Sequence, residues 1–159
     1  MSNPTSCECG RWCGRADALL GVPGVHMTAV AQAATGLIVH GQTAQGLTGC
    51  PACGVAAVGH RRRRVRLHDI PCCGGPVRLV RAKRLWQCRV GLCPTTVVSE
   101  QHSLAGKRAI LTNRAIRWAT DAVEKCDASV SALSHQLGVS WRVLLKGIET
   151  EGRRRVGRL

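Results

Sequence analysis

The chain has 159 residues, of which 45% are hydrophobic, and a formal net charge of +14 from 23 basic and 9 acidic residues. No stretch approaches the roughly 18 apolar residues of a membrane span, and this charge favours a polyanionic partner over an acidic small molecule. The chain has four Trp but neither Phe nor Tyr, so its core consists mainly of small aliphatic side chains and needs stabilisation beyond packing.

The basic excess is uneven along the chain. Residues 1–49 carry two basic and two acidic residues, residues 50–106 carry ten and two, and residues 107–159 carry eleven and five. The start, MSNPTSCECGRWCGR, lacks the pattern of a signal peptide. We therefore expect a cytoplasmic, nucleoid-associated protein without a membrane partner. The chain has ten cysteines, and in a reducing cytoplasm paired cysteines more often bind a metal ion than form disulfides.

The first elements are predicted to be a tail and a hairpin. Residues 1–17 are rich in Gly and Cys and predict a cysteine-containing flexible tail. After a short apolar turn, two candidate strands cover residues 25–31 and 36–43, and the polar residues 32–35 connect them.

A second, strongly basic hairpin is predicted further along. Its strands cover residues 58–67 and 77–87, and a turn rich in Asp, Pro and Gly separates them. In the second strand three apolar residues alternate with two arginines and a tryptophan, namely Val77, Leu79 and Leu85 with Arg78, Arg84 and Trp86.

Beyond Ser99 the spacing of apolar residues becomes helical. The first helix covers LTNRAIRWATDAVEK with Thr112 as its N-cap, and a second fits ASVSALSHQL with Asp127 or Ser129 as its cap. A third fits SWRVLLKGIE, capped by Ser140. The predicted fold class is α+β, in which a β-hairpin zinc-ribbon-like domain precedes a three-helix helix-turn-helix domain.

Two short cysteine motifs predict a structural zinc site. CPACG provides Cys50 and Cys53, and WQCRVGLCP provides Cys88 and Cys93. Cysteines two residues apart reach adjacent corners of a tetrahedron from one tight turn, and the second hairpin folds back to bring the two pairs together. A closed four-cysteine Zn²⁺ site organises a fold and has no open position for catalysis. Buried free thiols or a redox pair are the alternative.

The other cysteines are weaker candidates for a site. Cys72 and Cys73 are adjacent and too close to serve as a standard ligand pair, and Cys126 is expected at a helix end. The motif CECGRWC provides Cys7, Cys9 and Cys13, which would need a fourth ligand such as His26 or His40 to hold a second metal. The roles of the tail cysteines and of the adjacent pair stay open.

The segment SVSALSHQLGVSWRVLLKGIE has the layout of a helix-turn-helix, with Gly138 at the turn. In such a unit the early residues of the second helix reach base edges in the major groove. The residues expected to face DNA are Ser140, Trp141, Arg142 and Lys146, and Arg142 is the expected base reader. Two ordinary packed helices are the alternative. Phosphate contacts are expected from Arg61, Arg62, Arg63 and Arg64.

Several of these motifs together resemble the amino-terminal part of insertion-sequence transposases of the ISL-three type. The matching stretches are ALLGVPGVHMTAV, CPACG, HDIPCCGGPVRL, KRLWQCRVGLCP and the helix-turn-helix from Asp127 onward. The resemblance covers about residues 18 to 159 and implies a zinc-binding domain and a helix-turn-helix that recognise terminal inverted repeats. It also implies that the catalytic carboxylate domain is missing, since the chain ends where that domain would begin and Glu149 and Glu151 match no part of its triad.

The predicted domains are a tail over 1–17, a β-rich zinc-binding domain over 18–100, a helix-turn-helix domain over 101–151 and a basic tail over 152–159. The expected function is binding of double-stranded DNA at transposon ends without cleavage. A zinc-stabilised RNA-binding protein that stacks bases on Trp86, or an accessory subunit of an active transposase, is the alternative. A second copy of the chain or a full-length transposase would be a further partner.

Overall fold

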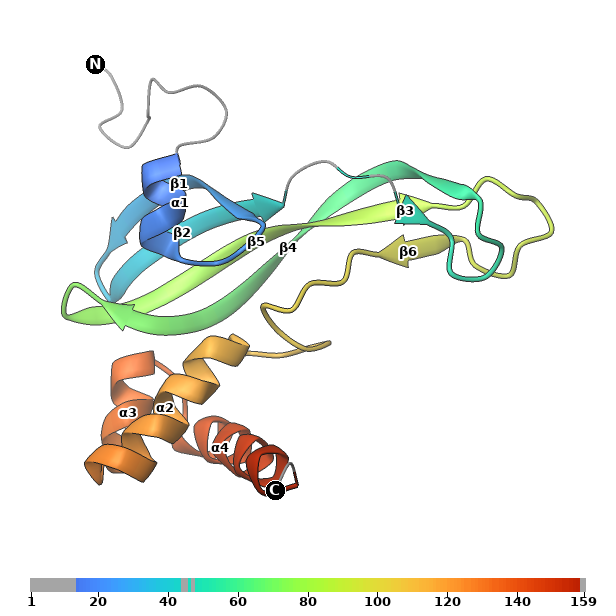
Figure 1. Cartoon of the computed structure of the whole chain (residues 1–159). Coiled ribbons are helices and arrows are strands. Elements are labelled where there is room, and N and C mark those ends of the chain that lie inside the picture. Colours follow the sequence, from blue (N-terminus) through green and yellow to red (C-terminus); the bar gives the residue numbers. More distant parts are fainter. Residues whose placement is uncertain (1–13, 44–45, 47, 158–159) are drawn as a thin grey trace, which may run out of the picture. The chain divides into compact units, whose positions relative to one another are not determined.

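The computed structural model describes residues 14–43, 46 and 48–157. In this part of the chain the helices and strands form an α+β fold (Figure 1), as the sequence predicts. Among the described residues, no helix combines the length and the apolar character that a membrane crossing requires.

The strands lie in the order β1–β2–β5–β4–β3, and β6 pairs with β5. The pairs β3 with β4 and β5 with β6 are antiparallel. A parallel bridge joins His68 to Leu111, so the sheet is mixed. The bounds are β1 Val25–Ala33, β2 Gly36–Thr43, β3 Thr48–Gly49, β4 Ala56–Cys72, β5 Gly75–Gln87 and β6 Val97–Ser99.

Both predicted hairpins are present, with shorter connections than expected. Only two residues, 34 and 35, separate β1 from β2. Only Cys73 and Gly74 separate β4 from β5, with φ angles of 52° and 76°. Positive φ at both central residues is what a type I′ turn requires, and this turn matches the twist of the flanking strands. The expected Asp- and Pro-rich turn is therefore wrong, because residues 68–72 continue the strand.

The chain forms two compact units that interleave along the sequence, whereas the predicted domains meet at residue 100. The first unit contains the described residues up to Ala29 together with His40–Val65 and Val80–His102. The second contains Val30–Val39, Arg66–Leu79 and the described residues from Ser103 onward.

The first unit begins with helix α1, Gly14–Leu20, whose first four residues fall within the predicted tail. Asp17 on this helix accepts hydrogen bonds from the backbone N–H of Met27 at 2.7 Å and pairs with His26 Nδ1 at 2.7 Å. The buried apolar residues of this unit include Leu20, Val25, Ala57, Val80 and Trp86.

The second unit contains the three helices α2 (Asn113–Cys126), α3 (Val130–Leu137) and α4 (Trp141–Val156). Their shared core consists of Leu111, Ala115, Ala119, Leu133, Leu137 and Leu144. Ala115 and Ala119, like Leu133 and Leu137, are four residues apart, which places each pair on one face of its helix. The N-caps are also as predicted, since Thr112 Oγ1 accepts from Ala115 N and Ser129 Oγ accepts from Ala132 N.

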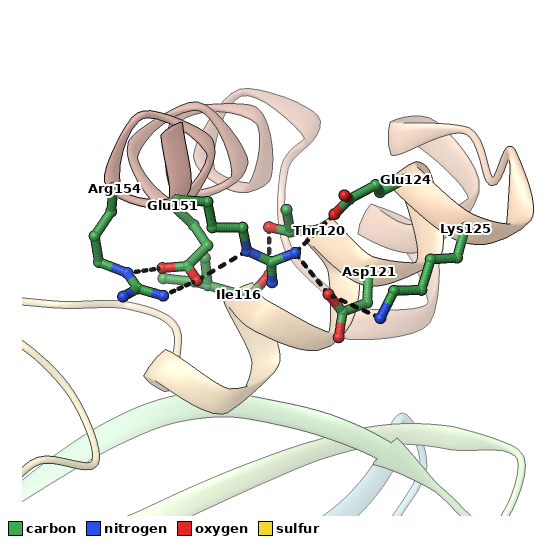
Figure 2. Close-up of polar contacts among 8 residues, drawn as sticks. Ile116, Thr120, Asp121, Glu124, Lys125, Glu151 and Arg154 are labelled. Carbon is green, nitrogen blue, oxygen red and sulfur yellow. Dashed lines mark hydrogen bonds and ion pairs between the residues drawn. The ribbon is translucent and has the colours of Figure 1, made fainter. Parts of the chain in front are cut away.

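Two details of the helices differ from expectation. Asp127, one of the two suggested caps of α3, instead ends α2 in a left-handed conformation with φ 50°. Helix α4 continues to Val156, so the predicted basic tail from residue 152 is mostly helical. The extension is held by ion pairs that Arg155 makes with Asp121 at 2.7 Å and Glu124 at 2.8 Å on α2 (Figure 2).

Candidate metal centre and basic surfaces

The first cysteine motif forms a tight turn between β3 and β4. The N–H of Cys50 donates to Val55 O and the N–H of Gly54 donates to Cys50 O, both at 2.8 Å. Gly54 has φ 72°, a left-handed conformation that glycine adopts without a steric penalty. The CPACG sequence therefore holds Cys50 and Cys53 in one knuckle through its own backbone hydrogen bonds.

The second motif follows β5 directly. The N–H of Cys88 donates to Thr96 O at 3.1 Å, and the N–H of Cys93 donates to Val90 O at 3.0 Å. These bonds close the loop between β5 and β6 and turn both thiols toward the first knuckle.

The four thiols come together as predicted. The Sγ–Sγ distance is 3.6 Å for Cys50 with Cys93 and for Cys53 with Cys88, and all four sulfurs lie within 4.8 Å of one another. A tetrahedral zinc site with Zn–S bonds of about 2.3 Å has sulfurs about 3.8 Å apart. A disulfide would need about 2.05 Å, and all four cysteines are free. The geometry therefore fits a metal ion.

The electrostatics of the cluster favour a cation at its centre. The backbone N–H groups of Ala52 and Cys53 lower the pKa of Cys50 to about 7. The N–H of Val90 also favours the thiolate of Cys88, but burial and hydrogen bonding with the neighbouring sulfurs outweigh it and raise the pKa of Cys88 to about 12. Four thiolates cannot coexist at this distance without a compensating positive charge, which a metal ion supplies.

The remaining cysteines do not join this cluster. Cys72 and Cys73 are exposed, with Sγ atoms 3.5 Å apart at the β4–β5 turn, and Cys126 is exposed at the end of α2. Cys7, Cys9 and Cys13 lie outside the described residues. Among the residues that the structure describes, the four-cysteine group is the only cluster suited to a metal.

The residues predicted to face DNA lie together at the start of α4. Ser140, Trp141, Arg142 and Lys146 are all exposed, and Trp141 retains 52% of its surface. Leu144, between them in sequence, is fully buried, so the helix is anchored by one face and presents the other. Ser140 occupies the N-cap position but its side chain makes no capping hydrogen bond.

The arginines of β4 are more accessible than strand alternation predicts. All four of Arg61–Arg64 are exposed. Alternation along a strand places half of them on each face, so neither face is covered at this point. Arg62 donates a hydrogen bond to the side chain of Gln42. Both faces of this segment are therefore available to solvent.

The alternation also misplaces residues of β5. Arg84 is 9% exposed and Trp86 is 8% exposed, although both were expected on the polar side of the strand. Arg81 is also buried and pairs with Glu100 at 3.0 Å. The buried Trp86 does not provide the open ring that base stacking requires, which weighs against the RNA-binding alternative.

Two acidic residues that bind arginines or a helix N-terminus were not predicted from the sequence. Asp69 is fully buried on β4 and accepts from Thr112 Oγ1 at 2.7 Å and Arg114 Nε at 2.8 Å. Glu100 accepts from Arg84 N and pairs with Arg81. They are the two acidic residues of the basic stretch 50–106, and the scarcity of acids there could have identified them as partners of its arginines.

Comparisons with protein-family models, with curated proteins and with solved structures gave no match. The fold and the cysteine cluster therefore define an α+β protein with a four-thiol candidate metal centre and basic surfaces on β4 and α4.

Proposed function

We propose that the protein binds double-stranded DNA through α4, that Zn²⁺ at Cys50, Cys53, Cys88 and Cys93 stabilises it, and that it does not cleave its target. The observation that carries the proposal is the exposed cluster of Trp141, Arg142 and Lys146 on the first turns of a helix whose opposite face is buried. An arginine fork so placed can pair with the two acceptors of guanine in the major groove.

The connection between α3 and α4 supports the assignment. Gly138 ends α3 with φ 67°, and its N–H bonds back to His135 O and Ser134 O. Val139 then packs partly buried against the helical core, and α4 begins after Ser140. A short glycine-containing turn between two helices is the arrangement found in helix-turn-helix units.

Strand β4 contacts the end of α3 beside this turn and the start of α2 within the second unit. His68 Nδ1 lies 2.9 Å from Leu137 O, and Asp69 binds Thr112 and Arg114 at the start of α2. A rigidly supported helix loses less conformational freedom on binding than a mobile one, which favours sequence-specific contacts.

Binding without cleavage is supported by the state of the carboxylates. Arg155 forms ion pairs with Asp121 at 2.7 Å, Glu124 at 2.8 Å and Glu151 at 3.2 Å. Glu151 also pairs with Arg154 (Figure 2). A two-metal nuclease requires carboxylates free to bind cations. Here arginines already neutralise the acids that lie closest together.

The resemblance to ISL-three type transposases supplies the proposed origin and target. A non-cleaving protein of this kind would recognise terminal inverted repeats and would inhibit a full-length transposase by competing for them. A thiolate tetrahedron suits Zn²⁺, although iron–sulfur centres use the same ligands.

The decisive experiment is selection of bound sequences from a random duplex library with zinc-loaded protein. The expected result is an enriched motif that Arg142→Ala loses. Enrichment of structured RNA over duplex in a parallel competition at fixed salt would favour the RNA-binding alternative and overturn the proposal. Cleavage of a selected duplex by pure protein with Mg²⁺ would overturn its non-catalytic part.

A further inference from the structure

A small basic pocket lies between β4 and β5 in the first unit. Its volume is about 240 Å³, and its walls come from residues 59–62 of one strand and 84–86 of the other. The charged residues of the lining are Arg61, Arg62 and Arg84, and no acidic side chain takes part in it.

Arg84 is the unusual member of this lining. Its side chain is more than nine-tenths buried, and its Nε makes no hydrogen bond within the described residues. One terminal nitrogen donates to Thr43 O at 3.3 Å, and the guanidinium lies 6.0 Å from the ring centre of Trp86. The indole N–H of Trp86 is likewise buried and lacks a partner among the described residues. Buried donors of this kind normally have an acceptor, so this pair is suited to a ligand that supplies one.

The charge of Arg84 is also incompletely balanced. Burial and the neighbouring charge of Arg62 lower the pKa of Arg84, and Glu100 opposes this effect. However, the carboxylate of Glu100 already pairs with Arg81 and accepts from the hydroxyl of Thr43 and the backbone N–H of Arg84. No carboxylate in the described part of the chain forms an ion pair with the guanidinium of Arg84.

We propose that this pocket binds a phosphate group, with Arg84 as the buried donor and Arg61 and Arg62 at its rim. A tetrahedral dianion offers several acceptors and matches the planar donor fork of arginine, so it satisfies the free Nε–H and balances the charge. The phosphate comes either from the backbone of the bound nucleic acid, which rests on the proposed function, or from a free phosphate. In the first case Arg84 adds an anchoring contact separate from the base contacts of α4.

The test follows the arginine Nε–H signals of the zinc-loaded full-length protein by ¹H–¹⁵N NMR during titration with inorganic phosphate, pyrophosphate and a duplex. Arg84→Lys keeps a positive charge and assigns the Arg84 signal by its loss. Arg78→Gln, at an exposed position on β5, is the matched control. The expected result is a saturable shift of the Arg84 signal with phosphate or pyrophosphate that acetate at equal ionic strength does not produce and that Arg78→Gln retains.

The duplex arm separates the two sources. If backbone phosphate is the ligand, the duplex shifts the same signal, and Arg84→Gln, which removes the positive charge, weakens all duplexes alike, with the slope of log affinity against log salt smaller in magnitude by about 1 than for wild type. A shift with phosphate and none with duplex assigns the pocket to a free phosphate. An Arg84 signal unmoved by all three ligands overturns the proposal. Loss of sequence preference in Arg142→Ala is independent of this signal, so failure of the DNA-binding proposal is recognised separately.

Discussion

Arg114 donates from Nε to Oδ1 of the fully buried Asp69 at 2.8 Å, which ties the first turn of α2 to strand β4 within the second unit. Thr112, the N-cap of the same helix, donates to the same carboxylate. One acidic side chain therefore orients both the start of α2 and the strand beside it. The helical core that buries one face of α4 depends on this arrangement.

Replacing Asp69 by Ala should destabilise the protein by about 3 kcal/mol, because it removes the buried carboxylate that accepts hydrogen bonds from Arg114 and Thr112. The matched control is Glu149→Ala, which removes an exposed ion pair to Arg153 at 3.8 Å and should cost less than about 0.5 kcal/mol. Urea unfolding followed by circular dichroism measures both. Equal losses in the two variants would contradict the role given to Asp69.

Metal removal should unfold much of the first unit. Binding to four thiolates contributes on the order of 10 kcal/mol of apparent free energy at neutral pH, and this core has few large side chains. We expect one zinc per chain by elemental analysis, and a large fall in melting temperature after chelation or in Cys88→Ser. The exposed Cys126→Ser is the control and should melt like wild type. Reduced, folded protein without bound metal would refute the assignment.

Two glycines at or near α4 should respond oppositely to alanine. Gly138 has φ 67° and an added Cβ would lie 3.2 Å from Cβ of Pro76, so Gly138→Ala should cost roughly 1 kcal/mol or more. Gly152 lies inside α4 with open space around an added Cβ, so Gly152→Ala should stabilise by up to about 1 kcal/mol. Thermal unfolding of both variants checks the pair. Stabilisation by Gly138→Ala would show that the turn is not left-handed.

Acidification should remove a stabilising contribution from Glu151. The hydrogen bond from Arg154, followed by that from Arg155, lowers the pKa of Glu151 from 4.5 to about 2. A carboxyl whose folded pKa is depressed stabilises the fold above its unfolded pKa and loses this contribution as pH falls toward the folded value. The stability difference between wild type and Glu151→Gln should therefore shrink from pH 5 to pH 2 as each is unfolded with urea. A difference independent of pH would contradict the ion pairs of Figure 2.

Arg142 and Arg63 should have different effects on DNA binding. Arg142→Ala should cost about 1 to 3 kcal/mol on the selected site and reduce sequence preference, because a base contact is lost. Arg63→Ala should weaken all duplexes alike, because phosphate contacts carry no sequence information. With about six phosphates neutralised, log affinity should fall against log salt with a slope of about 5 in magnitude. Equal losses of specificity in both variants would refute this division.

Local features account for what could be predicted. The knuckle at Cys50 and Cys53 closes through backbone bonds within five residues, and the caps Thr112 and Ser129 bond to residues three positions on. The turn at Cys73 and Gly74 could not be predicted in the same way. The preceding Asp69 reads as a turn residue, yet its partners on α2 lie more than 40 residues further along the chain.

The sequence by itself determined the helix boundaries at their N-caps, the two hairpins and the identity of the four clustered cysteines, because each depends on spacing within a short segment. Only the tertiary structure decided that Arg81 and Arg84 are buried while Arg61–Arg64 are exposed. Alternation along a strand specifies two faces, but which face is covered depends on elements distant in sequence. For the same reason, the sequence did not predict that Arg84, whose Nε–H has no partner among the described residues, lines a pocket between β4 and β5.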